Sequence, residues 1–341
     1  MNENIAQQRE GKIEKILKYL VWAGLLAVCF IPLFYSSKFY FPYVFPKSLA
    51  FRIIVEVIFL AFLGLAVMKK EYRPRLNLAL VLFFLYIAAV FVSSILGDSL
   101  YLSFWSNNER SEGLFLLLHL LAYLVILAGF LRSFKKWSII FEASFLSSIL
   151  VSLVALGQYL DLSWIVKSGG GQRLASTTGN AAYTAGYLIF NIFFGLILFF
   201  SRKNKILRWY YALGIILQIF IVLNTFTRGA ILALGLSFFV FLLYLVFSRL
   251  KQKKLLRGGI VAVLIFGVVF TIFIFLQKEA DWVKKSPILE RITSISTEAI
   301  TAQNRLMTWQ SAWQGFKQKP LLGYGYENFY QVFDKYFNPK I

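Results

Sequence analysis

Four arginines, each in a different polar segment of the chain, are the residues best suited to bind a ligand. They are Arg110 in FWSNNERSEGL, Arg173 in GGGQRLASTTGN, Arg228 in LNTFTRGAILALG and Arg305 in NRLMTWQ. An arginine side chain is permanently charged, and its rigid fork of N–H donors matches two oxygens of one phosphate group. If the four segments meet, they predict a site for a phosphorylated anion. The glycines at 169–171 and 179 would let the backbone approach such a ligand closely.

Three of these arginines also have plainer explanations. Arg110 can pair with its neighbours Glu109 and Glu112. Arg173 can be an ordinary loop cation, and Arg228 can extend toward lipid headgroups, as arginines at the ends of membrane helices do. Yet Arg228 lies in a very short connection without an acidic neighbour, so contact with a ligand is the favoured interpretation there.

The elements that must position these arginines are membrane-spanning helices. The chain has 341 residues, of which 59% are hydrophobic, and its mean hydropathy is +0.67. A soluble domain cannot bury that much apolar surface, and apolar stretches of about 18 residues or more recur along the chain. The alternating polarity of a β-barrel is absent, and only helices otherwise satisfy their own backbone in a bilayer. The predicted fold class is an all-α polytopic membrane protein with about nine transmembrane helices, over residues 19–36, 48–68, 76–97, 112–131, 137–160, 180–200, 207–226, 229–248 and 257–276.

Basic residues in the connections predict which side of the membrane each connection faces. Lysines and arginines concentrate before the first span and after the second, fourth, sixth and eighth. Because basic loops stay in the cytoplasm, the N-terminus is predicted to be cytoplasmic and the four candidate arginines to face outward. The formal net charge of +20 is then mostly a result of topology, and we expect no nucleic-acid partner. Arginines at the outer membrane–water boundary suit a lipid-linked diphosphate, whose charge lies at that height.

Three regions are predicted along the chain. They are a cytoplasmic N-terminal segment over residues 1–18, a transmembrane helix bundle over 19–276 and an extracytoplasmic loop region over 277–341. The first span is expected to be retained, since a mixed-charge segment precedes it and no small-residue cleavage site follows it.

The third region contains a predicted amphipathic helix from Ile300 to Phe316. Its apolar side chains recur at spacings of three and four residues, at Leu306, Trp309, Trp313 and Phe316. Pro320 is expected to end this pattern, and PLLGYGYENF to follow as a turn-rich stretch.

Other residues that could do chemistry inside the spans have structural explanations. Cys29 is the only cysteine and His119 the only histidine, so these residue types cannot build a metal site within the chain, and no metal or cofactor is expected. His119 is expected to be a satisfied histidine inside the bundle. Glu56 follows Arg52 by one helical turn, which predicts an internal ion pair.

Three segments together resemble the O-antigen ligase-like family of bacteria, which includes O-antigen ligases, polysaccharide polymerases and protein O-oligosaccharyltransferases. They are RLASTTGNAAYTAGYL (173–188), TFTRGAILALGL (225–236) and NRLMTWQSAWQGFKQKPLLGYGYENF (304–329). FWSNNERSEGL (104–114) is also similar to that family. The resemblance extends over residues of about 100–330, and its last two motifs are the most specific because several residue types agree in spacing.

The resemblance implies an inverting glycosyltransferase of lipopolysaccharide or other polysaccharide biosynthesis, which acts at the outer face of the bacterial cytoplasmic (inner) membrane. The donor would be a glycan on undecaprenyl diphosphate, and the acceptor hydroxyl would belong to a lipid, a glycan or a protein. Membrane lipids are the other expected partners. Arginines hold the diphosphate in the family, and the best matches by position are Arg228 and Arg305, followed by Arg173 and Arg110.

The chain departs from the family pattern in one respect. Family members carry a histidine shortly after the stretch that corresponds to PLLGYG, proposed to activate the acceptor hydroxyl, and further helices follow it. Neither is present up to residue 341, so the chain is expected to be an N-terminal fragment whose general base lies beyond residue 341. His119 lies in a different segment and is not expected to replace that histidine.

Two other functions stay open at this point. A transporter or flippase of a lipid-linked anionic substrate would use the same arginines without chemistry, and the carboxylates of Glu56 and Glu142 within or near spans raise this alternative. Such transporters contain internal repeats and broken helices, and no clear repeat is visible. A purely structural membrane subunit is the third alternative, against which the four outer arginines argue.

Overall fold

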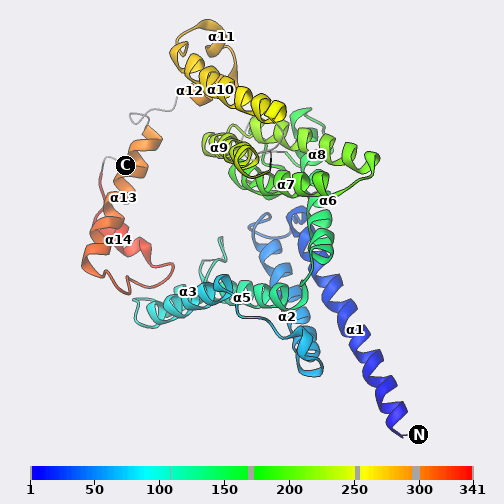
Figure 1. Cartoon of the computed structure of the whole chain (residues 1–341). Helices are drawn as coiled ribbons and strands as arrows, with labels where there is room; N and C mark the ends of the chain where they lie inside the picture. Colours follow the sequence, from blue (N-terminus) through cyan, green and yellow to red (C-terminus); the bar gives the residue numbers. More distant parts are fainter. Residues whose placement is uncertain (1, 108, 168–172, 250–253, 294–299, 340–341) are drawn as a thin grey trace. The chain divides into compact units, whose positions relative to one another are not determined.

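The computed structural model describes residues 2–107, 109–167, 173–249, 254–293 and 300–339. Figure 1 shows helices and loops throughout these ranges, and none of their residues belongs to a β-strand. Within them, eight helices are long and apolar enough to cross a membrane, and the fourth predicted span forms a shorter apolar helix. The predicted all-α polytopic membrane fold is therefore confirmed, with eight candidate spans by length instead of nine.

The nine predicted spans correspond in order to nine helices. These are α1 (Asn2–Phe30), α2 (Phe45–Met68), α3 (Leu78–Ile95), α5 (Leu114–Phe130), α6 (Phe134–Tyr159), α7 (Ala181–Ser201), α8 (Lys205–Asn224), α9 (Arg228–Tyr244) and α10 (Lys254–Leu276). Five further α-helices are α4 (Leu100–Trp105), α11 (Asp281–Lys284), α12 (Pro287–Thr293), α13 (Ile300–Gln318) and α14 (Phe329–Lys335). The predicted amphipathic helix is thus α13, and it ends shortly before Pro320.

Asparagine side chains start three of the long helices. The side-chain oxygen of Asn77 accepts from Leu80 N at the start of α3. Asn180 does the same at the start of α7, and Asn204 at the start of α8. An asparagine oxygen satisfies an N–H group that has no partner inside the helix, so these residues set where each helix begins.

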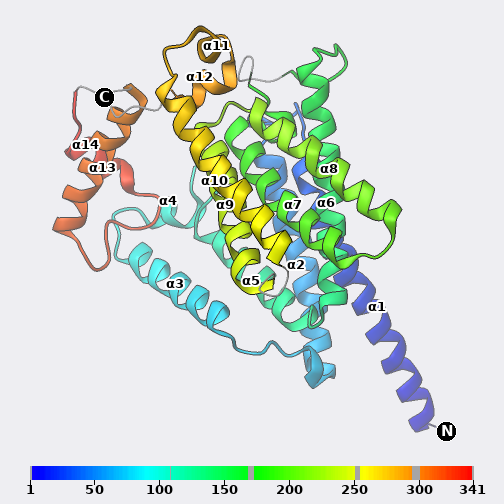
Figure 2. The same ribbon diagram turned by 45° about the horizontal axis from the view of Figure 1, so that its top comes forward.

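By packing, the chain divides into two compact units, residues 1–147 with 300–341 and residues 148–299. Figure 2 gives a second view of the helices that make up each unit. The division follows the contacts between backbone segments, whereas the predicted three regions follow position in the membrane and stay a prediction.

The first unit has its core between α1, α2 and α5. Buried side chains from these helices form one apolar cluster that includes Leu25, Phe62 and Phe130. A side chain at Gly24 would collide with Ile58, and one at Gly129 would collide with Phe62. Small residues at these contacts let the helices approach closely, as is common between helices in membranes.

The second unit is centred on the pair α7 and α8, which pack along each other. Its buried interior contains polar groups as well as apolar ones. Gln218 Nε2 on α8 donates to Ser148 Oγ on α6 at 3.0 Å, and Asn191 Nδ2 donates to the Tyr187 carbonyl oxygen at 2.9 Å. The Asn191 bond lies within α7, whereas the Gln218 bond joins two helices. Inside a bilayer a bond of the second kind holds helices together because no water competes for the polar groups.

His119 and Glu56 form a contact between α5 and α2 in the first unit. The two ring nitrogens of His119 lie 2.7 Å from the Phe115 carbonyl oxygen and 2.9 Å from Glu56 Oε1, so the prediction of a satisfied, buried histidine is confirmed. The predicted internal pair of Arg52 with Glu56 is wrong, since no ion pair joins these two described residues. Arg52 donates to the Ser111 carbonyl oxygen at 2.7 Å instead. The reason is that α2 packs on α5, which supplies Glu56 with a partner from another helix.

Candidate functional site

The loop that contains Arg173 and the turn that precedes Arg228 are joined by hydrogen bonds in the second unit. Arg173 Nε donates to the Thr225 carbonyl oxygen at 3.1 Å. A terminal nitrogen of the same guanidinium donates to Thr227 Oγ1 at 3.0 Å. Two of the four predicted segments are therefore brought together, although 52 residues separate Arg173 from Thr225.

The turn itself is short and tightly held. It covers residues 225–227, between the end of α8 at Asn224 and the start of α9 at Arg228. Thr225 is fully buried and its hydroxyl donates to the Val222 carbonyl oxygen at 2.7 Å, while Phe226 has a φ of +49°. A left-handed conformation is rare for an aromatic residue and persists only where the surroundings enforce it.

Arg228 is the first residue of α9 and is half-buried. The N-terminal end of a helix carries a partial positive charge and is a good place for an anion. Thr227, at the N-cap position, makes no side-chain cap to α9, and its hydroxyl accepts from Arg173 instead. Both acceptors of these Arg173 bonds are neutral, so these bonds leave the formal charge of the guanidinium in place.

The loop after Arg173 is anchored to α6 and α7. Ser176 is buried, its N–H donates to Gln158 Oε1 at 2.8 Å, and its hydroxyl donates to the Val151 carbonyl oxygen at 2.6 Å. Gly179 has a φ of +75°, a conformation that glycine adopts readily. The glycines at 169–171 lie outside the described residues. The anchored part of the loop fixes the position from which Arg173 reaches the turn.

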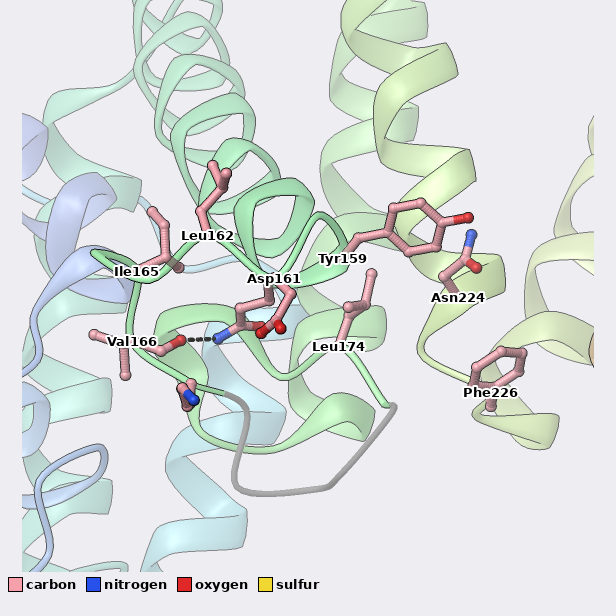
Figure 3. A pocket seen from close by; sticks show the side chains of 10 residues that line it. Tyr159, Asp161, Leu162, Ile165, Val166, Leu174, Asn224 and Phe226 are labelled. Carbon is pink, nitrogen blue, oxygen red and sulfur yellow. Dashed lines mark hydrogen bonds between the residues drawn. The ribbon is translucent and has the colours of Figure 1, made fainter.

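A cavity of about 400 Å³ adjoins the braced turn. Figure 3 shows Ile165 and Val166 along one side of this cavity and Asn224 and Phe226 along the other. The described residues that line it are Gln158, Tyr159, Asp161, Leu162, Ile165, Val166, Lys167, Leu174, Asn224 and Phe226. The lining combines two aromatic rings with amide, carboxylate and ammonium groups, a composition that can hold and orient a polar small molecule.

The other two candidate arginines, Arg110 and Arg305, belong to the first unit. Both are exposed. The backbone N–H of Arg110 donates to Asn107 Oδ1 at 2.8 Å, and no ion pair joins its side chain to Glu109 or Glu112 in the described part of the chain. Arg305 lies in the first turns of α13. The plainer explanation for Arg110, pairing with its neighbours, is therefore wrong.

The PLLGYGYENF stretch docks on the connection after α3. Ser103 Oγ donates to the Tyr326 carbonyl oxygen at 2.7 Å and accepts from Asn328 Nδ2 at 2.9 Å. The Asp98 N–H donates to the Tyr324 carbonyl oxygen at 3.3 Å. Ser103 and Asn328 are fully buried, so uncharged side chains form the interior of this joint. Beside them, Ser106 Oγ donates to Glu327 Oε2 at 3.1 Å.

Two glycines, Gly97 and Gly325, and the residue Tyr326 also belong to this joint. Gly325 has a φ of +94°, and a side chain at Gly97 would lie 2.7 Å from its Cα. The turn-rich prediction for this stretch is confirmed. Burial, with a smaller contribution from neighbouring groups such as Glu327, raises the pKa of Tyr326, so the phenol stays neutral near neutral pH.

Within the described residues no three histidine, cysteine, aspartate or glutamate side chains gather in a way that could hold a metal ion. The guanidinium groups of the candidate arginines are cationic and can bind the oxygens of an anionic ligand. The prediction of a phosphate site at all four arginines stays a prediction, and the geometry brings one pair of its segments into contact.

Sequence reasoning missed two parts of this region. The cavity beside the turn includes Asp161 and Asn224, which carry no motif and come from segments far apart in sequence. Ser103 and Asn328 were also missed, although each lies inside or beside a segment that resembles the family. Neither the spacing nor the type of these residues indicates a contact, so only the three-dimensional structure reveals them.

Comparison with known families supplies independent evidence. The model of the family described as O-Antigen ligase matches residues 213–340, a range that includes Arg228, Arg305 and the PLLGYGYENF stretch. No curated protein and no solved structure matches the chain. The match supports an enzyme of the membrane ligase or polymerase type, which transfers glycans. The predicted resemblance to the O-antigen ligase family is thereby confirmed over residues 213–340, which are similar to that family.

Proposed function

We propose that this protein transfers a glycan from an undecaprenyl-diphosphate carrier to an acceptor hydroxyl at the outer face of a bacterial cytoplasmic membrane. The observation that carries the proposal is the turn before Arg228, which the Arg173 guanidinium braces through two hydrogen bonds. Arg228 stands at the start of α9, directly after this turn. A cation held in this way is suited to a diphosphate because it needs little rearrangement when the ligand arrives.

In this mechanism the arginines act on the leaving group. The acceptor oxygen forms a bond to the anomeric carbon of the donor sugar, while the bond from that carbon to the phosphate oxygen breaks. The diphosphate leaves with the bonding electron pair, and its charge increases at that step. Arg228 would stabilise this charge directly, and Arg173 would keep the Arg228 turn in place, so that the stabilisation is greatest in the transition state.

The proton of the acceptor hydroxyl must pass to a base. In the family that the chain resembles, a loop histidine is proposed for that role. His119 is engaged with Glu56 and with the Phe115 carbonyl oxygen, so both of its ring nitrogens have partners. These contacts agree with the expectation that His119 does not replace the loop histidine.

The cavity beside the turn would hold the first sugar of the donor. Its volume of about 400 Å³ lies within the usual range of about 300–1,000 Å³ for small-molecule sites. Tyr159 and Phe226 offer apolar ring faces, and Gln158, Asp161 and Asn224 offer hydrogen-bonding groups. A sugar bound in this cavity would lie next to the proposed diphosphate site.

The test measures glycan transfer by full-length protein purified in detergent, with a lipid-linked donor and an acceptor. Detergent micelles have no two sides, so a flippase gives no product under these conditions. Removal of one anion-stabilising donor typically lowers turnover by about 10²–10³-fold, and we expect losses of this order for Arg228→Ala and smaller ones for Arg305→Ala.

Arg208→Ala is the matched control. Arg208 lies at the opposite end of α8 from the turn, over the ring of Phe199, and its loss should leave transfer close to the wild-type rate. If Arg228→Ala and Arg305→Ala both transfer normally at normal protein levels, the assignment of these residues to the diphosphate is wrong.

A further inference from the structure

The apolar stripe of α13 faces away from the element on which this helix packs. Its four large apolar side chains are 51–67% exposed: Leu306, Trp309, Trp313 and Phe316. The opposite side of α13 packs on α14 through small residues. Ser311 is buried and donates to the Tyr336 carbonyl oxygen at 2.8 Å, and a side chain at Gly315 would collide with Val332.

This arrangement is the reverse of the usual amphipathic helix of a soluble domain, which turns its apolar stripe toward the core. Two exposed tryptophans one turn apart form an unusual surface in water. Tryptophan favours the boundary between lipid headgroups and acyl chains, where its ring is apolar and its N–H reaches water.

The first unit ties α13 to the end of a membrane-spanning helix. Just after α13, the Leu322 carbonyl oxygen accepts from Ser93 Oγ near the end of α3 at 2.5 Å. The Tyr324 carbonyl oxygen accepts from the Asp98 N–H just beyond α3. Since α3 is a candidate span, its end marks the membrane–water boundary, and the C-terminal end of α13 lies close to that level. Figures 1 and 2 both show α13 running across the direction of α3.

Charged groups beside the stripe fit the same surface. Arg305 lies one helical turn before Trp309, and Lys317 Nζ lies 5.8 Å from the centre of the Trp313 ring. Helices that lie on membranes place basic residues next to the apolar face, where they contact lipid phosphates. Basic groups beside aromatic rings therefore complement a phospholipid surface.

We propose that α13 lies in the plane of the membrane, with Leu306, Trp309, Trp313 and Phe316 inserted at the boundary between headgroups and acyl chains. The partner is the phospholipid surface around α3. This inference does not depend on glycosyl transfer. If the proposed function is also correct, α13 holds Arg305 at headgroup height, where the charge of a lipid-linked diphosphate lies.

The experiment uses the full chain in liposomes of phosphatidylethanolamine and phosphatidylglycerol. Cys29 is the only cysteine, so a Cys29→Ser background allows a single fluorescent label at a chosen site. The test position is Trp313→Cys, labelled with an environment-sensitive fluorophore, and Trp309→Cys repeats the measurement one turn earlier. The matched control is Gln303→Cys, an exposed polar position of the same helix outside the four apolar positions.

Quenching is measured with nitroxide-bearing lipids and, separately, with aqueous iodide. We expect lipid quenching to be several-fold stronger at positions 313 and 309 than at position 303, and iodide quenching to show the opposite order. Strong iodide quenching at all three positions would overturn the proposal, because the stripe would then face water. Protection of positions 313 and 309 from both quenchers would overturn it too, because protein would then cover the stripe.

Discussion

The two units join distant segments by different chemistry. In the second unit a guanidinium, that of Arg173, connects its loop to the turn before α9. In the first unit the fully buried, neutral side chains of Ser103 and Asn328 connect the PLLGYGYENF stretch to the connection after α3. Both joints hold segments that resemble the same family.

The difference indicates a division of roles. A neutral joint costs less to desolvate than a charged one, so it suits a contact whose purpose is to hold two segments in position. A guanidinium bonded to a carbonyl and a hydroxyl retains its charge and projects a positive field toward any adjoining ligand. We infer that the joint in the second unit serves binding, and the joint in the first unit serves stability.

The largest effect that this comparison predicts belongs to Arg173. Arg173→Ala removes two hydrogen bonds from a charged donor, each worth about 1.5–3 kcal/mol, and the turn loses its brace. Transfer is expected to fall by about 10–100-fold, measured as the initial rate with purified full-length protein. Because the two bonds also stabilise the fold, the rate is compared per amount of folded protein.

Arg173→Lys separates charge from geometry. Lysine retains the cation but lacks the planar fork that reaches both acceptors, so transfer should recover only in part. Full recovery would show that the brace is dispensable and that only charge matters. An Arg173→Ala protein that transfers normally but unfolds more easily would reverse the roles assigned to the two joints.

The next effect is on stability and concerns Gly325. At its φ of +94°, Gly325→Ala introduces strain of about 1–3 kcal/mol, and the new methyl group would lie 2.6 Å from Asn328 Nδ2. The thermal midpoint of full-length protein in nanodiscs should fall. Gly323→Ala is the matched control, because its φ is +65° but no atom lies within 4 Å of a methyl group there. Equal losses in the two variants would mean that backbone strain alone matters and that the joint does not.

The sequence predicted the helices well because the length and apolar composition of a stretch are enough to indicate a membrane-spanning helix. It predicted the contacts between segments poorly. Glu56 was expected to pair with Arg52 on its own helix, yet its partner is His119 on α5, since helix packing is not visible in local spacing. The stripe of α13 was predicted from periodicity, but periodicity cannot tell whether a stripe faces protein or the exterior.

A smaller effect is expected for Ser103→Ala. The hydroxyl of Ser103 both donates and accepts in the neutral joint, and its removal leaves the Asn328 amide with a longer contact to the Ser99 carbonyl oxygen at 3.4 Å. We expect a loss of about 1 kcal/mol in the free energy of unfolding, with transfer by the remaining folded protein unchanged. A selective loss of transfer at unchanged stability would place this joint in the binding machinery.

The smallest effect concerns the one ion pair that crosses the joint of the first unit among the described residues, between Lys319 Nζ and Asp98 Oδ1 at 3.6 Å. Both side chains are well exposed, and pairs of this kind contribute about 0–1 kcal/mol. Lys319→Gln should therefore lower the thermal midpoint slightly at low salt. The difference from wild type should vanish near 1 M salt, where screening acts over about 3 Å. A larger loss that persists at high salt would show that charge stabilises this joint as well, and the contrast between a neutral joint and a charged one would no longer hold.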